Sequence, residues 1–350
     1  MILSRSPYYK YIPWERPSDG EVATSYTLEL FIWQGDKVSD KPSDPEYRRT
    51  KQNVESLTTS DKVDISVLIN DYIENTVIEA NNTSLNDGNC AVWVSSQVVY
   101  KVGESETTEL ISTDFATKGF AFGYEVENYE PVSNLLSDTT EIDVDKTSIV
   151  HLPFFVGEVV REGDVTIISY PNNNLNETFA PTYNGLSSEV LKVVTIDCND
   201  AGDDLYIEVS YFGDVVRYFL REECIYKVHD VQFINRYGAS QSLTFFGKRQ
   251  DSLSVKGDEY KASFGRPNLG NHQNVKYNVN GSSSFSLFTG YLYEGQNQMY
   301  KELALSESVW LDGLPVNVSL SGVDFKTRIN DKVCSYTFDF TNSYDEVASI

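Results

Sequence analysis

The sequence predicts a mainly β protein built from tandem β-sandwich units, the first of fibronectin or immunoglobulin type, with one or two short helices. Aromatic residues make up 13% of the 350 residues, including 23 Tyr and 18 Phe, and such side chains favour strands. Many short runs alternate apolar and polar residues between turn-forming Gly, Asn and Asp. Only two segments have the apolar spacing of an amphipathic helix.

Three domains are predicted, because a chain of 350 residues is long enough for two or three hydrophobic cores. Residues 1–130 are expected to form an N-terminal β-sandwich. Residues 131–225 are expected to form an acidic connector and a second β unit, and residues 226–350 a C-terminal β unit with a helix. The polar, acidic segment 125–147 is interpreted as the linker or excursion between the first two domains.

The opening segment, SRSPYYKYIPWERP, is rich in proline and aromatic residues. Pro7, Pro13 and Pro17 exclude a helix here, so the segment is predicted to be an extended arm or an edge strand. Its aromatic side chains could contact a neighbouring subunit. A strand packed on its own domain is the equally weighted alternative. The aromatic residues concerned are Tyr8, Tyr9, Tyr11 and Trp14.

The first domain then contains a strand, a helix candidate and a second, longer strand. In YTLELFIWQGDK, the alternate apolar residues between positions 26 and 32 fall on one face of a strand. VDISVLINDYIEN carries an apolar stripe at helical spacing, with Asp64 as the N-cap. After a turn at 86–89, residues 90–102 predict a long strand.

Residues 226–260 are interpreted as the hairpin around which the chain is organised. Its two alternating runs, around Val231 and Leu243, are separated by a turn at 237–238. The strands of the second unit precede it, in TIISY, LKVVTI, LYIEVSYF and VVRYFL. A helix at 291–306, with Leu292, Met299 and Leu303 along one face, follows it. A closing strand hairpin that turns around 330–331 comes last.

The negative charge is unevenly distributed. The formal net charge is −24, from 28 basic and 52 acidic residues. The first 225 residues carry 16 basic and 39 acidic residues, or −23, whereas residues 226–350 carry 12 and 13, or −1. A strongly acidic surface repels nucleic acid, so sequence-specific nucleic-acid binding is not expected. The near-neutral part is the expected region of packing against partners.

The cysteines and the N-terminus suggest a protein of the cytoplasm in which it is made. The four cysteines are far apart and form no C-x-x-C pair, which predicts reduced, buried thiols. No signal-peptide pattern follows Met1, and no apolar run approaches the roughly 20 residues that a membrane helix needs, so membrane insertion is not expected. The cysteines are Cys90, Cys198, Cys224 and Cys334.

No catalytic motif is recognisable. His151, His229 and His272 stand in no metal-binding spacing. No G-x-S-x-G motif precedes a helix, and no Gly-rich phosphate loop follows a strand. The chain is therefore predicted not to be an enzyme and to need no cofactor, while a hydrolytic site made of scattered residues stays open.

One segment, DCNDAGDDLYIE, partly matches a calcium-binding loop. Asp197, Asn199, Gly202 and Glu208 stand at positions 1, 3, 6 and 12 of such a loop. Ala201 stands where a further side-chain ligand belongs, and the flanking segments are strand-like instead of helical. The segment is a weak calcium candidate, with an acidic hairpin loop as the alternative. The aromatic surplus could also serve carbohydrate stacking, although no motif localises such a site.

Several stretches resemble virion proteins of tailed bacteriophages that infect Bacteroidetes, including crAss-like phages. SRSPYYKYIPW, YTLELFIWQGDK and VDISVLINDYIE resemble the N-terminal sandwich of these proteins. VQFINRYGASQSLTFFGKRQDSLSVKGDEYK resembles their central hairpin. SLFTGYLYEGQNQMYKELALSESVWLDG and VDFKTRINDKVCSYTFDF resemble their closing helix and hairpin. The resemblance covers most of the chain in pieces, and its motifs are structural.

The resemblance implies a structural component of the virion, such as a tail ring, adaptor or baseplate subunit, assembled in the host cytoplasm. A homo-oligomeric ring in contact with other tail or portal-proximal proteins is then expected, because sheet edges invite pairing between subunits. A receptor- or glycan-binding appendage of the same virion is the alternative. The residues expected at interfaces are Tyr8, Tyr9, Tyr11, Trp14, Tyr237, Trp310 and Leu311.

Overall fold

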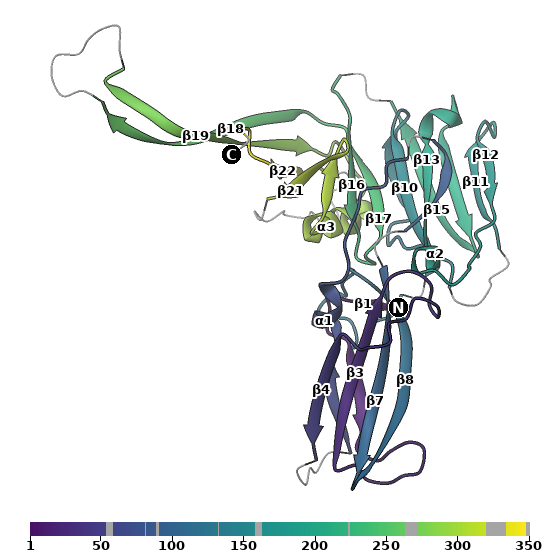
Figure 1. Ribbon diagram of the computed structural model, residues 1–350. Helices are drawn as coiled ribbons and strands as arrows, with labels where there is room; N and C mark the ends of the chain where they lie inside the picture. The colour runs from purple at the N-terminus through teal and green to yellow at the C-terminus, as the bar shows by residue number, and fades with distance from the viewer. Residues whose placement is uncertain are drawn as a thin grey trace.

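The computed structural model confirms a mainly β fold, with 52% of residues in strands and 8% in helices. The N-terminal sandwich forms the lower part of the molecule in Figure 1, and the other sheets lie above it. The structure describes residues 1–53, 59–80, 82–88, 91–131, 133–157, 163–222, 225–262, 272–319 and 334–347.

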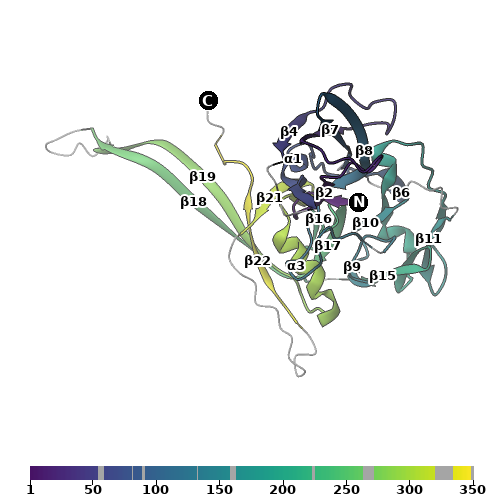
Figure 2. The same ribbon diagram turned by 90° about the horizontal axis from the view of Figure 1, so that it is seen from below.

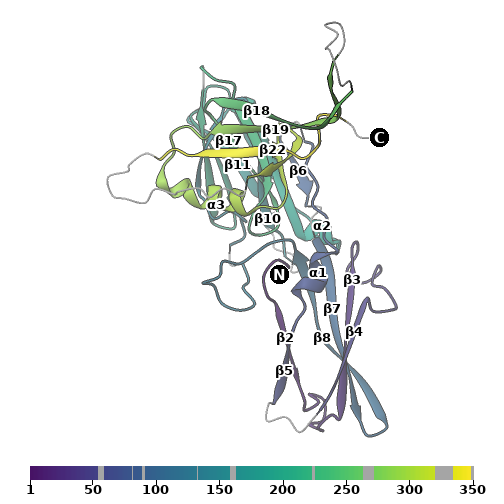
Figure 3. The same cartoon turned by 90° about the vertical axis from the view of Figure 1, so that its left-hand side faces the viewer.

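The N-terminal unit has two layers. A five-stranded sheet in the order β1-β8-β7-β3-β4 faces a two-stranded sheet of β2 and β5 (Figure 3). The alternation predicted for residues 26–32 is confirmed, since Tyr26, Leu28, Leu30 and Ile32 are all buried. The strands are β1 (Ile2–Leu3), β2 (Tyr9–Pro13), β3 (Ser25–Trp33), β4 (Tyr47–Gln52), β5 (Ser60–Asp64), β7 (Ala91–Val102) and β8 (Ser105–Thr117).

The helix predicted in this unit is present but short. It is α1 (Ser66–Asn70), and the apolar stripe continues into the turns on either side, where Ile65 and Ile73 are buried. Asp64 does cap it, one position earlier than the formal N-cap, Ile65. Its Oδ1 accepts hydrogen bonds from the backbone N and Oγ of Ser66, at 3.0 and 2.7 Å.

The second unit is a sandwich of two sheets, in the orders β10-β13-β6 and β12-β11-β14-β15-β9. Two predictions for this region are wrong in detail. Residues 86 and 87, expected in a turn at 86–89, instead end a strand that pairs with β13, and the segment 125–147, interpreted as a linker or excursion, contains a strand that pairs in parallel with β15. The elements are β6 (Ser84–Asp87), β9 (Glu141–Asp145), β10 (Ile149–Phe155), β11 (Val165–Tyr170), β12 (Asn176–Phe179), α2 (Ser187–Val190), β13 (Leu191–Asp197), the 3-10 helix η1 (Cys198–Ala201), β14 (Tyr206–Tyr211) and β15 (Asp214–Arg221).

The third unit is a seven-stranded sheet in the order β17-β16-β20-β21-β22-β19-β18. The predicted central hairpin is confirmed as β16 and β17, and the predicted helix as η2 and α3. The turn expected at 330–331 lies outside the described residues. The elements are β16 (His229–Ile234), β17 (Ser240–Phe245), β18 (Arg249–Lys261), β19 (Asn274–Phe288), η2 (Glu294–Gln296), α3 (Asn297–Leu305), β20 (Val309–Leu311), β21 (Leu314–Val318) and β22 (Thr337–Asn342).

The second and third units share one hydrophobic core. Strand β10 lies against β17, and side chains of both units, such as Phe154 and Phe245, belong to one buried cluster. Burial of this many apolar side chains is the main stabilising contribution to the upper part of the molecule. Of the cysteines, Cys198 and Cys334 are buried free thiols as predicted, while Cys90 and Cys224 lie outside the described residues.

Within the described part of the chain, no helix has the length and apolar character needed to span a membrane.

Candidate functional site

Strands β18 and β19 form a long two-stranded ribbon that projects from the body (Figures 1 and 2). Within β19, only Ser284–Phe288 pairs with β22. In the described chain, residues 253–261 of β18 and 274–283 of β19 therefore pair only with each other as strands. We call these residues the projecting ribbon. The C-terminal residues 345–347 contact it at Asn280 and Gly281.

The projecting ribbon exposes apolar side chains. Leu253 and Val255, two positions apart on one face, are each 59% exposed. Tyr260 and Tyr277 form a ring pair at 5.7 Å, and Tyr260 remains 52% exposed. An isolated two-stranded hairpin is only marginally stable in water. The ribbon therefore has sheet edges that no further strand of the described residues covers, and an apolar surface, the two features that promote pairing with another chain.

The ribbon also differs from the rest of the molecule in charge. The projecting ribbon carries three basic and two acidic residues, a formal charge of +1, whereas the remainder of the chain carries 25 basic and 50 acidic residues, or −25. The ribbon is thus a slightly positive projection from a strongly negative body. Opposite charge on ribbon and body favours contact between copies of the chain.

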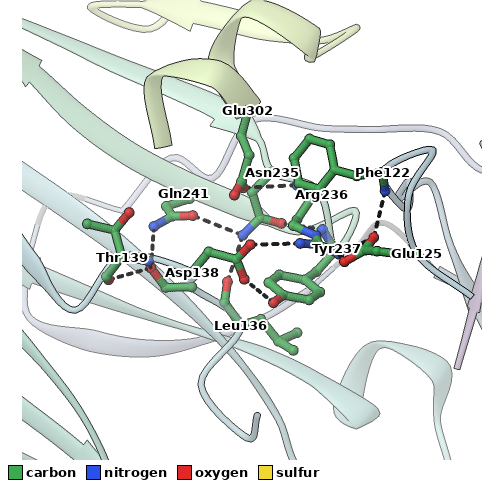
Figure 4. A network of polar contacts seen from close by, with 11 residues as sticks. Phe122, Glu125, Leu136, Asp138, Thr139, Asn235, Arg236, Tyr237, Gln241 and Glu302 are labelled. Atoms are coloured by element: carbon green, nitrogen blue, oxygen red, sulfur yellow. Dashed lines mark hydrogen bonds and ion pairs between the residues drawn. The ribbon is translucent and has the colours of Figure 1, made fainter. Parts of the chain in front are cut away.

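A second feature, a buried polar network around Arg236, holds the three units together (Figure 4). Arg236 lies in the turn between β16 and β17 and is only 4% exposed. Its Nη2 donates to both carboxylate oxygens of Glu125, at 2.6 and 2.7 Å, and its Nη1 donates to Asp138 at 2.8 Å. Glu125 lies in the segment that follows β8 of the first unit, and Asp138 lies in the segment that leads into β9 of the second unit. One side chain therefore ties all three units together.

One buried cation faces two carboxylates in this network. Burial disfavours a charged guanidinium, but the hydrogen bonds to Glu125 and the charge of Asp138 raise the pKa of Arg236 above its ordinary value. Glu302 of α3 accepts a hydrogen bond from the Arg236 backbone N at 3.2 Å. Burial, with the negative charge of Asp138, raises the pKa of Glu302 to about 8. Glu302 is therefore largely protonated at neutral pH.

The turn that carries Arg236 fits closely against the N-terminal unit. Gly238 has a φ of +74°, and a Cβ there would lie 2.6 Å from the backbone N of Gly119. The Thr117 hydroxyl donates to the Tyr237 carbonyl at 2.7 Å, and the Phe120 N donates to the Arg236 carbonyl at 2.7 Å. Glycine is required where the backbone adopts this conformation and approaches a neighbour so closely. The turn thus fixes the sheet that carries the ribbon on the N-terminal sandwich.

The residues predicted at interfaces are divided by the structure into buried and accessible groups. Tyr8, Trp14, Tyr237 and Leu311 are buried within this chain, with 4–8% of their surface exposed, so their aromatic or apolar character reflects the chain's own core. For Tyr8 and Trp14 this matches the alternative of a strand packed on its own domain, since β2 pairs with β5. Tyr11 is 50% exposed, and Tyr9 and Trp310 are partly exposed. An interface at these three positions stays a prediction.

The calcium candidate is not assembled as a loop. Asp197 caps the 3-10 helix η1, accepting hydrogen bonds from the N and Nδ2 of Asn199 at 3.0 and 2.9 Å. Glu208 lies within β14 and pairs with Arg217 across the sheet at 2.9 Å. Residues 198–205 connect two different sheets, so the segment is not a hairpin either. No group of three or more His, Cys, Asp or Glu in the described residues could hold a metal ion.

His151 forms no catalytic relay in the described residues. His151 Nδ1 lies 2.6 Å from the Ser242 hydroxyl, and burial lowers the pKa of His151 to about 4. The nearby carboxylate of Asp230 is bonded instead to the hydroxyls of Ser148 and Thr244, at 2.6 and 3.0 Å. A serine hydrolase needs a carboxylate on the second nitrogen of the histidine ring, so this pair has the arrangement of a buried structural contact.

The sequence interpretation did not anticipate the ribbon or the Arg236 network. The alternation of Leu253 and Val255 in one segment, and of Val275, Tyr277 and Val279 in the next, was a detectable signal for the ribbon. The network joins residues more than 60 positions apart, and no local pattern marks it. In comparisons with known proteins, neither a protein-family model nor a curated protein matches this chain.

Proposed function

We propose that this chain is a structural subunit of a bacteriophage virion, of the ring, adaptor or baseplate kind, which assembles by docking its projecting ribbon onto a second copy. The observation that carries the proposal is the ribbon itself, an exposed two-stranded projection with apolar side chains on a strongly acidic body. The resemblance of the sequence segments to virion proteins of tailed phages supports the placement in a virion.

The exposed apolar side chains of the ribbon support a role in assembly. Burying the exposed part of an apolar side chain that is about half exposed contributes about 1 kcal/mol. The five such residues of the projecting ribbon would together contribute about 5 kcal/mol, before any backbone pairing at its edges. They are Leu253, Val255, Tyr260, Tyr277 and Val279.

Charge supports a second copy as the partner. The projecting ribbon carries +1 and the rest of the chain −25, so each copy supplies both members of a complementary pair. Such a contact is head-to-tail, because ribbon and body are different surfaces. Repeated head-to-tail contacts close into a ring when the rotation between subunits allows it. The Arg236 network supports the same role, since a fixed ribbon direction makes that rotation reproducible.

Sedimentation velocity of the full-length protein over a wide concentration range tests the proposal. The wild-type chain is expected to form oligomers whose association weakens at high salt. The double variant Leu253→Asp/Val255→Asp removes apolar contact and places two carboxylates on the ribbon. We expect it to weaken association about 100-fold, or about 3 kcal/mol.

The matched control is Val38→Asp/Val67→Asp, which adds the same two charges at exposed valines outside the ribbon, 81% and 70% exposed. It should associate like the wild type. A wild-type chain that stays monomeric at every concentration, or equal association of the two double variants, contradicts the ribbon contact. Absence of the chain from purified particles, checked by mass spectrometry, contradicts the virion placement.

A further inference from the structure

A pocket lies between β9, β15 and the segment that leads into α3. Its volume is about 610 Å³, within the range of small-molecule sites. The lining includes Phe219, Arg221, Asp143, Tyr293 and Gln296. These residues come from the second and third units, so the pocket depends on the shared core that holds the two units together.

Two aromatic side chains line this pocket. Phe219 ends a row of rings across the outer face of the sheet, in which Tyr170 and Tyr206 lie 5.1 Å apart and Tyr206 and Phe219 lie 5.8 Å apart. The three residues are directly paired on neighbouring strands, so the row holds Phe219 in place. Tyr293, from the third unit, is 63% exposed, which leaves much of its ring available for contact.

The polar groups of the pocket are fixed in position. Asp143 is buried, and it accepts hydrogen bonds from Arg221 Nη2 at 2.6 Å and from Gln296 Nε2 at 2.7 Å. Burial raises the pKa of Asp143 above its ordinary value, with Arg221 opposing the shift. Arg221 Nη1 also donates to the Tyr291 carbonyl at 3.0 Å. With 34% of its side chain exposed, Arg221 still has N–H groups to offer a ligand.

We propose that this pocket binds a neutral saccharide. The apolar face of a sugar ring can stack on an exposed tyrosine, and its hydroxyl groups both donate and accept hydrogen bonds. The lining offers donors on Arg221 and an acceptor on Glu141. Three carboxylates, those of Asp138, Glu141 and Asp143, against one arginine make an anionic ligand such as a phosphate unfavourable.

The saccharide site is independent of the proposed assembly role. It gives a location to glycan binding, for which the sequence offered no motif. A chain with such a pocket could contact the sugar-covered surface of a cell while forming part of a larger particle. Because the projecting ribbon lies outside the pocket, binding should be the same in assembling and non-assembling forms of the full-length chain.

A glycan array carrying neutral, acidic and amino sugars, probed with full-length protein, is the first measurement. Saturation-transfer NMR with the best neutral oligosaccharide then follows for the variants. Tyr293→Ala should reduce binding at least tenfold, because it removes the exposed stacking ring. Tyr291→Ala is the matched control, since Tyr291 is 70% exposed, two residues away and not part of the lining, and it should bind like the wild type.

Repeating the NMR experiment on Leu253→Asp/Val255→Asp separates this inference from the assembly proposal. Equal saccharide binding by that variant supports an independent site, whatever its oligomeric state. Absence of any neutral-sugar signal for the wild type overturns the inference. The inference is also overturned if Tyr293→Ala binds the saccharide as well as the wild type does. It is overturned as well if the chain binds basic peptides, added as competitors, and no sugar.

Discussion

Replacement of Arg236 by methionine tests whether one buried side chain holds the three units together. The methionine keeps an unbranched, apolar side chain of similar length but removes the guanidinium. It leaves the carboxylates of Glu125 and Asp138, whose side chains are only 15% and 21% exposed, without their cationic partner. It also removes the cation from above the rings of Phe122 and Tyr129, at 4.7 and 4.9 Å.

The expected loss of stability follows from these contacts. Removing one partner of a buried ion pair costs about 3–5 kcal/mol, because an uncompensated charge stays buried. Since both carboxylates retain some contact with water, we expect a value near the lower end, about 3 kcal/mol. This corresponds to a change of about 100-fold in the unfolding equilibrium constant.

Tryptophan fluorescence during urea unfolding is a suitable assay, because the tryptophans report on different units. Trp14, Trp33 and Trp93 lie in the N-terminal unit, and Trp310 lies in the third unit. In Arg236→Met, the N-terminal signal should unfold at lower urea and separately from the far-ultraviolet circular dichroism. In the wild type, the two signals should change together.

A rescue variant distinguishes charge from shape. Arg236→Met combined with Glu125→Gln and Asp138→Asn removes the unpaired charges and should recover at least about 1 kcal/mol of the loss. The reasoning is refuted if Arg236→Met unfolds within about 1 kcal/mol of the wild type, which is the typical effect of a neutral substitution. It is also refuted if the triple variant is less stable than Arg236→Met.

Two further predictions concern the same junction. The pKa of Glu302 is about 8 in the folded chain against an ordinary 4.5, so the folded state keeps a proton that the unfolded state releases, and this group lowers stability as pH rises from about 4.5 to 8. In Glu302→Gln the free energy of unfolding should therefore depend less on pH, and at pH 9 it should exceed that of the wild type by about 1 kcal/mol or more. Urea unfolding midpoints measure this difference. A variant less stable than the wild type at pH 9 would contradict the reasoning. Gly238→Ala should cost more than about 2 kcal/mol, because its Cβ would lie 2.6 and 2.7 Å from backbone nitrogens. Gly103→Ala is its control, with a similar φ of +61° and nothing within 4 Å, and similar losses in the two variants would contradict the steric argument.

The elements predicted well from the sequence are those set by local pattern. The face formed by residues 26–32 and the β16–β17 hairpin were predictable because a strand with one buried face must alternate. The apolar stripe at Leu292, Met299 and Leu303 also lies in the core as expected. Gly295 lies inside the short 3-10 turn η2, which precedes α3, and this explains why the helix begins later than its pattern suggests.

The elements that the sequence did not predict depend on contacts between distant segments. An N-terminal segment rich in aromatic residues looks the same in sequence whether its side chains contact a neighbouring subunit or the core of their own chain. The sequence therefore could not decide between these two locations for Tyr8 and Trp14. Strand β6 pairs with β13 more than 100 residues away, which no periodicity reveals. Charged residues near 125 and 138 suggested a solvated linker, because their partner Arg236 is known only from the fold. The three predicted domain boundaries stay a prediction, although the second and third units share a core.

Hydrogen–deuterium exchange of the projecting ribbon tests the central claim most directly, because it follows the backbone that is proposed to dock. Peptides covering 253–261 and 274–283 should exchange rapidly in dilute, dissociated protein, since this two-stranded element has few buried contacts. In the assembled form the same peptides should become protected at least about tenfold, while β7 and β10, already buried, change little. Equal exchange of the ribbon in dissociated and assembled protein would contradict the account.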